Sequence, residues 1–331
     1  MRPRVALLFI LTLLLAACRV EPPPANGWGI VAADPKTGDV GVTAAACEDY
    51  PLDYRAVLVP DRGAGVALGI SSPLQRDRLA QWIAEPLPAP QVITRLTDSS
   101  NDSDAELRQY GVVTLQGGSA QAAGFTGTQI AAPAGNLEDA ANAVTVVGGA
   151  LANPDALQAA LDAYREPAAS SLPLPDHLLR ALEAVSAANG VALCNQNGIT
   201  QTASTAFILV AHSGDSAFRT MTLGVPAQKE AQPPWLALSV KLPRGGRNAV
   251  GVLREEYEQW RPAHLPPCVE CNLAPIAVPA GGTLTTPPNA WVQTNGLCLI
   301  TVFILVIALL TTLWFTLRPH PAPRAPLSPD A

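Results

Sequence analysis

An uncharged apolar segment near the C-terminus constrains this chain more than any other feature of its sequence. Residues Leu297–Leu317 (LCLITVFILVIALLTTLWFTL) contain no charged side chain, and a helix of this length spans the roughly 30 Å hydrocarbon core of a bilayer. A buried helix of a globular domain would need a polar face, which this segment lacks. Arg318 and Arg324 follow it, and basic residues mark the cytoplasmic side of a membrane. We therefore expect a transmembrane helix over 296–317 and a cytoplasmic tail over 318–331.

The N-terminal residues have the order of a secretory signal over 1–18. Arg2 and Arg4 precede an apolar run, and small residues lead to Cys18. The stretch from Leu15 to Cys18 resembles the lipobox of bacterial lipoproteins, which implies that Cys18 is lipidated. An uncleaved anchor helix or an ordinary secretory signal are the alternatives, but the apolar run is short for a spanning helix. We predict a protein of the bacterial cytoplasmic membrane that contacts lipid at both ends, with its domain outside.

Proline-rich segments divide the chain between these two ends. Residues 19–26 form a short spacer, whereas residues 261–295 lack apolar periodicity and are predicted to form an extended stalk. Residues 27–260 remain as one candidate domain. The formal net charge of -6, without a basic stripe, argues against nucleic acid as a partner.

Strand and helix patterns occur in groups through this domain. The turn sequences DPKTGD, DRG and QGGS each separate two short apolar runs, as in β-hairpins. Two helical patterns follow, PDALQAALDAYRE and PDHLLRALEAVSAANG, and strands over 205–212 and 235–242 precede a closing helix over 248–260. This order predicts a layered α+β fold with a largely antiparallel sheet.

Five blocks of the domain resemble a bacterial family in their order and spacing. They read WGIVAADPKTGDVGV, VLVPDRGAGVALGIS, ELRQYGVVTLQGGSAQAAGFTG, VVGGALANPDALQAALDAYRE and LREEYEQW. The family is domain of unknown function 1028, and the resemblance covers residues 27–260. It is grouped with the N-terminal-nucleophile hydrolases, which implies their four-layer α-β-β-α sandwich. The resemblance implies no settled substrate.

The start of the first strand lacks the nucleophile that this resemblance implies. In the superfamily a Thr, Ser or Cys begins the strand, its side chain attacks an amide, and its own free α-amine accepts the proton. Members commonly begin with Thr-Phe-Ser, but the matching residues here are Gly27, Trp28 and Gly29. No Ser, Thr or Cys lies in Arg19–Lys36, so shifting the alignment restores no nucleophile. Cys18 cannot substitute, because lipidation would consume its thiol.

Cysteine and threonine provide the remaining candidate site residues. Cys47 ends the second strand, where it is either a displaced nucleophile or the disulfide partner of Cys194. We favour the disulfide, because no histidine is positioned by sequence to activate a thiolate. Thr43 is the second weak catalytic candidate. Cys268 and Cys271 lie in the predicted stalk, where a local or inter-chain disulfide is favoured over metal, and an inter-chain bond would join a homodimer.

No cofactor or metal is predicted. The four histidines show no ligand spacing, and the sequence contains neither Gly-x-Ser-x-Gly nor His-Glu-x-x-His. The first hypothesis is a membrane-anchored extracytoplasmic domain that has lost its nucleophile and acts as a binding or scaffold module for an unknown small-molecule or peptide ligand. The alternative is an amide or peptide hydrolase that uses Thr43 or Cys47. A third hypothesis is a signalling protein that reports through its membrane helix.

Overall fold

The computed structural model describes residues 26–166, 172–195, 200–219, 233–266 and 274–282 of the 331-residue chain. These ranges fall within one compact unit, residues 24–287. The predicted signal with Cys18, the pair Cys268 and Cys271, the membrane helix over 296–317 and the tail lie outside the described residues. Within the described ranges, no helix is both long enough and apolar enough to cross a membrane.

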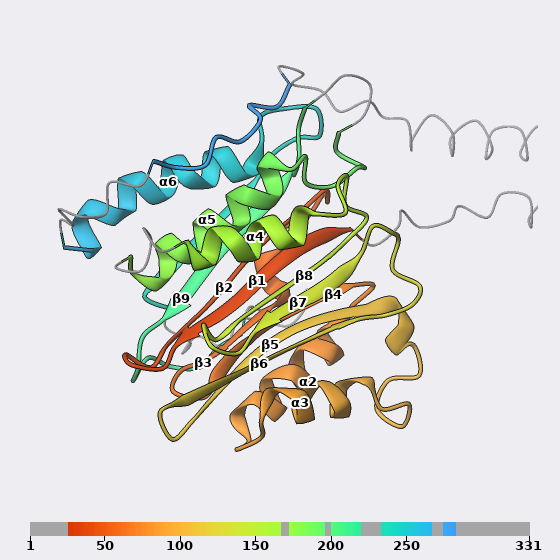
Figure 1. Ribbon diagram of the computed structural model, residues 1–331, viewed down its shortest axis with the longest axis vertical. Helices are drawn as coiled ribbons and strands as arrows, with labels where there is room; N and C mark the ends of the chain where they lie inside the picture. The colour runs from red at the N-terminus through yellow and green to blue at the C-terminus, as the bar shows by residue number, and fades with distance from the viewer. Residues whose placement is uncertain (1–25, 167–171, 196–199, 220–232, 267–273, 283–331) are drawn as a thin grey trace, which may run out of the picture. The chain divides into compact units, whose positions relative to one another are not determined.

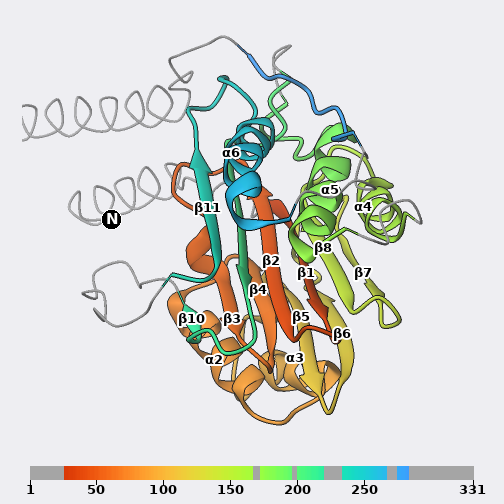
Figure 2. The same cartoon turned by 90° about the vertical axis from the view of Figure 1, so that its left-hand side faces the viewer.

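Two antiparallel sheets form the centre of the domain. Figure 2 shows the first, whose six strands have the order β11-β9-β2-β1-β8-β7. The second has five strands in the order β10-β3-β4-β5-β6. The first sheet consists of β1 (Gly27–Asp34), β2 (Asp39–Ala46), β7 (Gly135–Asp139), β8 (Val144–Gly149), β9 (Thr205–Ala211) and β11 (Leu236–Lys241). The second consists of β3 (Ala56–Val59), β4 (Gly63–Gly69), β5 (Arg108–Gln116), β6 (Ser119–Thr126) and β10 (Phe218–Arg219).

Five α-helices of the described chain cover the outer faces of the two sheets (Figure 1). On the first sheet lie α4 (Ala156–Arg165), α5 (Leu174–Ala187) and α6 (Ala249–His264), and on the second lie α2 (Pro73–Ala84) and α3 (Ala89–Thr97). Three apolar clusters fill the spaces between helices and first sheet, between the two sheets, and between second sheet and helices. The layers therefore follow the order helix, sheet, sheet, helix, in agreement with the predicted layered fold.

The side chains of β1 show how the layers are joined. Trp28 and Ile30 lie in the cluster under α4 to α6, whereas Val31 and Ala33 lie in the cluster between the sheets. This is the alternation that a pleated strand imposes. Because both faces of β1 are covered by protein, the strand is apolar throughout rather than alternating between apolar and polar residues.

The structure confirms the three predicted hairpins and the predicted helices α4, α5 and α6. The hairpins pair β1 with β2, β3 with β4 and β5 with β6. The helices α2 and α3 and the strands β7 and β8 were not predicted. In α2 the buried residues include Gln75 and Arg76 beside Leu79 and Trp82, and these polar residues interrupt the apolar periodicity by which helices are recognised.

The structure departs from the predicted stalk in two segments, because residues 261–264 still belong to α6 and residues 274–282 contact the domain. Residues 274–282 lie along the domain rather than extending away from it. Arg180 Nη1 donates to the carbonyl oxygen of Ala274 at 2.9 Å, and Asn248 Nδ2 donates to that of Pro279 at 2.8 Å. A proline-rich segment has few N–H donors, but its carbonyl groups still accept hydrogen bonds from such side chains.

Candidate functional site

The first residue of β1 occupies a position that only glycine fits. Gly27 is buried, pairs with Gly149 of β8 and has a φ of +124°, a conformation that residues with a Cβ rarely adopt. A Cβ here would lie 2.9 Å from both the carbonyl oxygen of Ala45 and the Cβ of Ala46. A nucleophilic side chain therefore has neither the backbone conformation nor the space that it would need.

Gly29 is the second position at which the family resemblance places a hydroxyl, and it faces the space between the sheets. A Cβ there would lie 3.1 Å from Val66 Cγ1 and 3.4 Å from Leu68 Cδ1, both on β4. Val66 and Leu68 are fully buried. A hydroxyl at position 29 would be surrounded by apolar side chains, where an unpaired polar group is costly.

Asn26 occupies the chain position in front of β1. Its Oδ1 accepts a hydrogen bond from the backbone N–H of Cys47 at 2.7 Å, and its Nδ2 donates to the carbonyl oxygen of Cys47 at 3.4 Å. Asn26 is 4% exposed. The nitrogen of Gly27 is held in a peptide bond to this buried residue, so the free α-amine of the superfamily mechanism would form only if that bond were cut.

Both weak catalytic candidates have their reactive groups engaged. Thr43 is fully buried in β2, and its hydroxyl donates to the carbonyl oxygen of Phe207 at 2.6 Å. Cys47 forms the disulfide with Cys194 that the sequence analysis favoured, with Cα atoms 5.5 Å apart. This bond joins the end of β2 to the turn that follows α5. The structure thus places Thr43 and Cys47 where they support the fold.

A buried ion pair lies beside this end of β1, and the sequence analysis did not single it out. Glu48 and Arg55 are 7% and 4% exposed, and Arg55 Nη2 lies 3.2 Å from the carboxylate of Glu48. The same guanidinium donates to the hydroxyl of Tyr50 at 2.8 Å, the hydroxyl of Tyr54 at 3.0 Å and the carbonyl oxygen of Gly69 at 2.9 Å. It therefore connects the end of β2 with the end of β4.

The environment of Glu48 perturbs its protonation. Burial raises the pKa of the Glu48 carboxyl, although the charge of Arg55 and a hydrogen bond from Tyr50 oppose this shift. Burial also raises the pKa of the Tyr50 phenol. A carboxyl with a raised pKa can transfer protons in catalysis, but it must reach a reacting group to do so. Glu48 instead contacts the arginine that holds its own loop. The only sequence signal for this cluster is the segment CEDYPLDYR, which gathers its acid, its arginine and both tyrosines.

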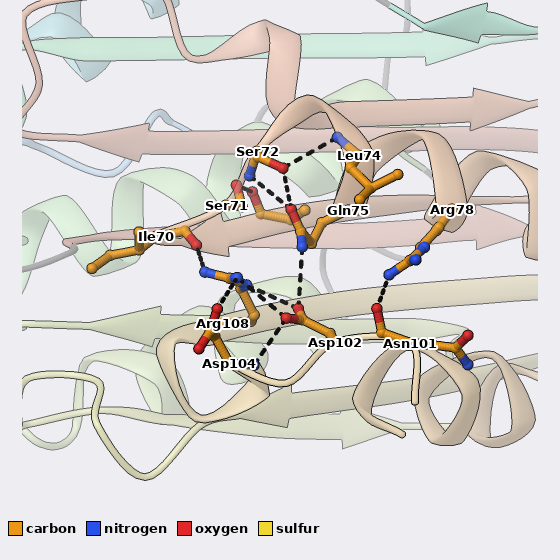
Figure 3. Close-up of polar contacts among 11 residues, drawn as sticks. Ile70, Ser71, Ser72, Leu74, Gln75, Arg78, Asn101, Asp102, Asp104 and Arg108 are labelled. Atoms are coloured by element: carbon orange, nitrogen blue, oxygen red, sulfur yellow. Dashed lines mark hydrogen bonds and ion pairs between the residues drawn. The ribbon is translucent and has the colours of Figure 1, made fainter. Parts of the chain in front are cut away.

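A second buried ion pair supports the turn between β4 and α2 (Figure 3). Arg108 Nε donates to Asp102 Oδ2 at 2.9 Å, and Gln75 Nε2 donates to the same oxygen at 3.3 Å. Arg108 also donates to the carbonyl oxygen of Ile70. Burial would raise the pKa of Asp102, but hydrogen bonds from Arg108 and from the backbone of Asp104 hold it below the usual range. The pair stays ionised and fixes the turn.

The start of β1 is thus buried and held by structural contacts. Gly27, Gly29 and Asn26 are all buried, and neither glycine carries a side chain that could act as a nucleophile. Among the residues that the structure describes, no group of three or more His, Cys, Asp or Glu side chains is placed to hold a metal ion.

Comparison with known proteins identifies relatives of this fold. Residues 27–235 match the sequence model of a family of unknown function, DUF1028. Among solved structures, the chain is similar to the crystal structure of a protein from Silicibacter pomeroyi that carries the same family name. The two share 21% sequence identity at a TM-score of 0.53, over 71% of this chain and 89% of that one. At this identity the likeness concerns the fold alone. No curated protein matches the chain.

Proposed function

The chain belongs to the DUF1028 family, and we propose that its domain is a membrane-anchored, extracytoplasmic sandwich of the N-terminal-nucleophile-hydrolase type. In this proposal the domain has lost its nucleophile and acts as a binding or scaffold module. The single observation that carries the proposal is the geometry of Gly27. Its φ of +124° and the 2.9 Å approach of Ala45 and Ala46 leave no place for a side chain.

The proposed loss of the catalytic centre involves the contacts around the start of β1 as well as the missing side chain at position 27. A simple loss of the nucleophile would leave an open cleft around an intact backbone. Here Asn26 is paired with Cys47, and that cysteine is bonded to Cys194. The chain around the former reaction centre is therefore reinforced by contacts that an accessible nucleophile and a free amine would not permit.

A scaffold role agrees with the way the domain is held together. Glu48 and Arg55 join the ends of two strands, and Asp102 and Arg108 fix the turn that follows one of them. Removing one partner of such a buried pair leaves an uncompensated charge, so these pairs hold their segments in one arrangement. The ligand class that we propose remains a small molecule or a peptide, bound without chemical conversion.

The hydrolase alternative would require Thr43 or Cys47 to react. Thr43 would first have to break its hydrogen bond to Phe207 and become exposed, and Cys47 would have to be released from Cys194. We therefore retain this alternative only as an outcome of the test.

The test uses the full chain, purified in detergent, with a panel of acyl-amide and peptide substrates and with electrophilic probes for Ser, Thr and Cys nucleophiles. We expect no turnover above buffer and no stoichiometric labelling, together with thermal stabilisation by some members of the panel. Turnover that Thr43→Val abolishes would establish the hydrolase. Thr114→Val, at a second buried strand threonine, is the matched control. Turnover that neither variant changes would mean that a residue other than Thr43 is catalytic, and it would also contradict the proposal.

A further inference from the structure

The first and last described residues lie at the same end of the domain. Asn26 pairs with Cys47, and the carbonyl oxygen of Cys47 also accepts a hydrogen bond from Arg244 Nη2 at 3.2 Å. Two residues further along that loop, the carbonyl oxygen of Gly246 accepts a hydrogen bond from the N–H of Gly282 at 2.8 Å. The chain therefore enters and leaves the described domain at the end where β1 begins.

The large apolar side chains that are exposed among the described residues lie at this same end. Tyr50 is 39% exposed, Ile70 45% and Leu74 53%. One guanidinium, that of Arg55, holds both the Tyr50 hydroxyl and the carbonyl oxygen of Gly69, which directly precedes Ile70. Leu74 lies in the first turn of α2, next to the turn that contains Ile70 (Figure 3). We call Tyr50, Ile70 and Leu74 the apolar rim.

The exposure of the apolar rim is built into the fold. The turn that carries Ile70 is held by Arg108, whose other partner is the buried Asp102. Ser72 begins α2 with a capping box, in which its side chain accepts from the backbone of Leu74 and the Gln75 side chain accepts from the backbone of Ser72. The rim therefore presents three apolar side chains from a fixed framework.

We propose that the apolar rim rests on the lipid bilayer, so that the end of the domain at which β1 begins faces the membrane. This inference rests on the membrane anchoring in the proposed function. If Cys18 carries lipid, seven residues separate it from Asn26, and this connection, eight residue steps long, reaches at most about 28 Å. The last residue of β1 lies ~26 Å beyond Asn26. A connection this short favours the end at which β1 begins as the face toward the membrane.

The chemistry of the rim fits the interfacial region of a bilayer. Tyrosine places its ring at the level of the lipid headgroups, while isoleucine and leucine side chains enter the acyl boundary. The exposed acidic side chains at this end, Asp49 (77% exposed) and Asp104 (60%), form ion pairs with Arg244 and Arg108, so they leave no excess charge to attract an anionic lipid surface. The contact is therefore apolar, and it should depend little on salt or on anionic lipid.

The test places a photoreactive p-benzoylphenylalanine in the full chain, reconstituted in phosphatidylcholine nanodiscs, and detects lipid adducts on peptides by mass spectrometry. The probe replaces Tyr50 or Leu74 at the rim, Lys36 in the exposed β1–β2 turn at the opposite end, or Phe303 in the apolar segment. We expect adducts at Phe303, and adducts at both rim positions at a yield at least about fivefold above that at Lys36. Addition of anionic lipid or salt should leave these yields unchanged.

The outcomes separate the two proposals. Adducts at Phe303 together with rim yields no higher than at Lys36 would overturn the membrane contact and leave the anchoring intact. Absence of adducts at Phe303 would overturn the anchoring, and the inference with it. With the probe at Tyr50, Leu74→Asp should reduce the adduct yield severalfold. Gln81→Asp, at an exposed position on the same helix, should leave it unchanged; an equal loss in both variants would count against an apolar contact.

Discussion

Asn26 pairs with the backbone of Cys47 through both ends of its side-chain amide, at 2.7 Å and 3.4 Å. The amide thereby imitates the peptide group of one further strand residue. The hydrogen bonding between β1 and β2 thus continues one residue beyond Gly27. In the superfamily mechanism the nitrogen of the residue at position 27 would instead be a free amine. The same Cys47 carries the disulfide, so the side chain of Asn26 and the Cys194 sulfur hold one residue from two sides.

Replacing Asn26 with alanine should lower the free energy of unfolding by about 1–3 kcal/mol, because the buried backbone N–H of Cys47 would lose its acceptor, while the carbonyl oxygen keeps its hydrogen bond from Arg244. Chemical unfolding of the full chain in detergent, followed by tryptophan fluorescence, measures the change. Gln81→Ala, at an exposed position of α2, should change it by less than about 0.5 kcal/mol. Equal effects of both variants would show that the Asn26 amide contributes nothing specific.

Gly27→Ala should destabilise the protein more than Gly117→Ala. Both positions have a positive φ, but a Cβ at Gly117 meets no atom within 4 Å, whereas one at Gly27 meets Ala45 and Ala46 at 2.9 Å. Gly117, with a φ of +56°, reports the cost of the left-handed helical conformation alone, about 1–2 kcal/mol. At Gly27 the φ of +124°, which alanine adopts less readily, and the steric overlap should together add about 1–3 kcal/mol. The same unfolding experiment compares them, and similar losses would contradict the crowded geometry.

Removal of the disulfide by the double substitution Cys47→Ser and Cys194→Ser should lower stability by as much as about 5 kcal/mol. The bond joins residues 147 positions apart, and the restriction of the unfolded chain grows with the size of the closed loop. Melting temperatures of wild type with and without reductant, compared with those of the double variant, measure the effect. A wild type whose melting temperature does not respond to reductant would argue that the bond is not formed.

Glu48 should make stability fall as pH rises above about 4.5, its ordinary pKa. In that range the folded protein retains a proton that the unfolded chain releases, and the loss is complete above the raised pKa of the folded state. Glu48→Gln removes this dependence, so the stability difference between wild type and variant should shrink with rising pH. Asp53, whose pKa burial also raises, is present in both proteins and cancels. Parallel pH profiles of unfolding would refute the assignment.

Arg108→Lys should cost about 2–4 kcal/mol, because a lysine cannot replace the guanidinium that holds both Asp102 and Ile70 in a buried site. Arg95→Lys is the matched control, since its ion pair with Glu85 is exposed on both sides, and such pairs contribute less than about 1 kcal/mol. Unfolding in denaturant measures both. A small loss at Arg108 would mean that the turn carrying Ile70 does not depend on this pair.

Features that depend on neighbouring residues could be predicted from the sequence. The turns DPKTGD, DRG and QGGS each lie between two runs that are close enough in sequence to pair with each other, so each hairpin followed from local chemistry. The absence of Ser, Thr and Cys from Arg19–Lys36 was equally evident. In such cases the residues that interact are also close in sequence.

The remaining features depend on partners that are distant in the chain. Gln75 and Arg76 make α2 appear too polar to be buried, and the buried acceptor of the Gln75 Nε2 group, Asp102, is brought near only by folding. The proline-rich residues 274–282 lie on the domain because Arg180 and Asn248, far away in sequence, donate to their carbonyl groups. The sequence of a segment shows which donor, acceptor and apolar groups it contains. Its hydrogen bonds, steric contacts and burial also depend on groups that only folding brings close. For this reason the absence of Ser, Thr and Cys around the first strand could be read from the sequence, but the crowding and burial at Gly27 could not.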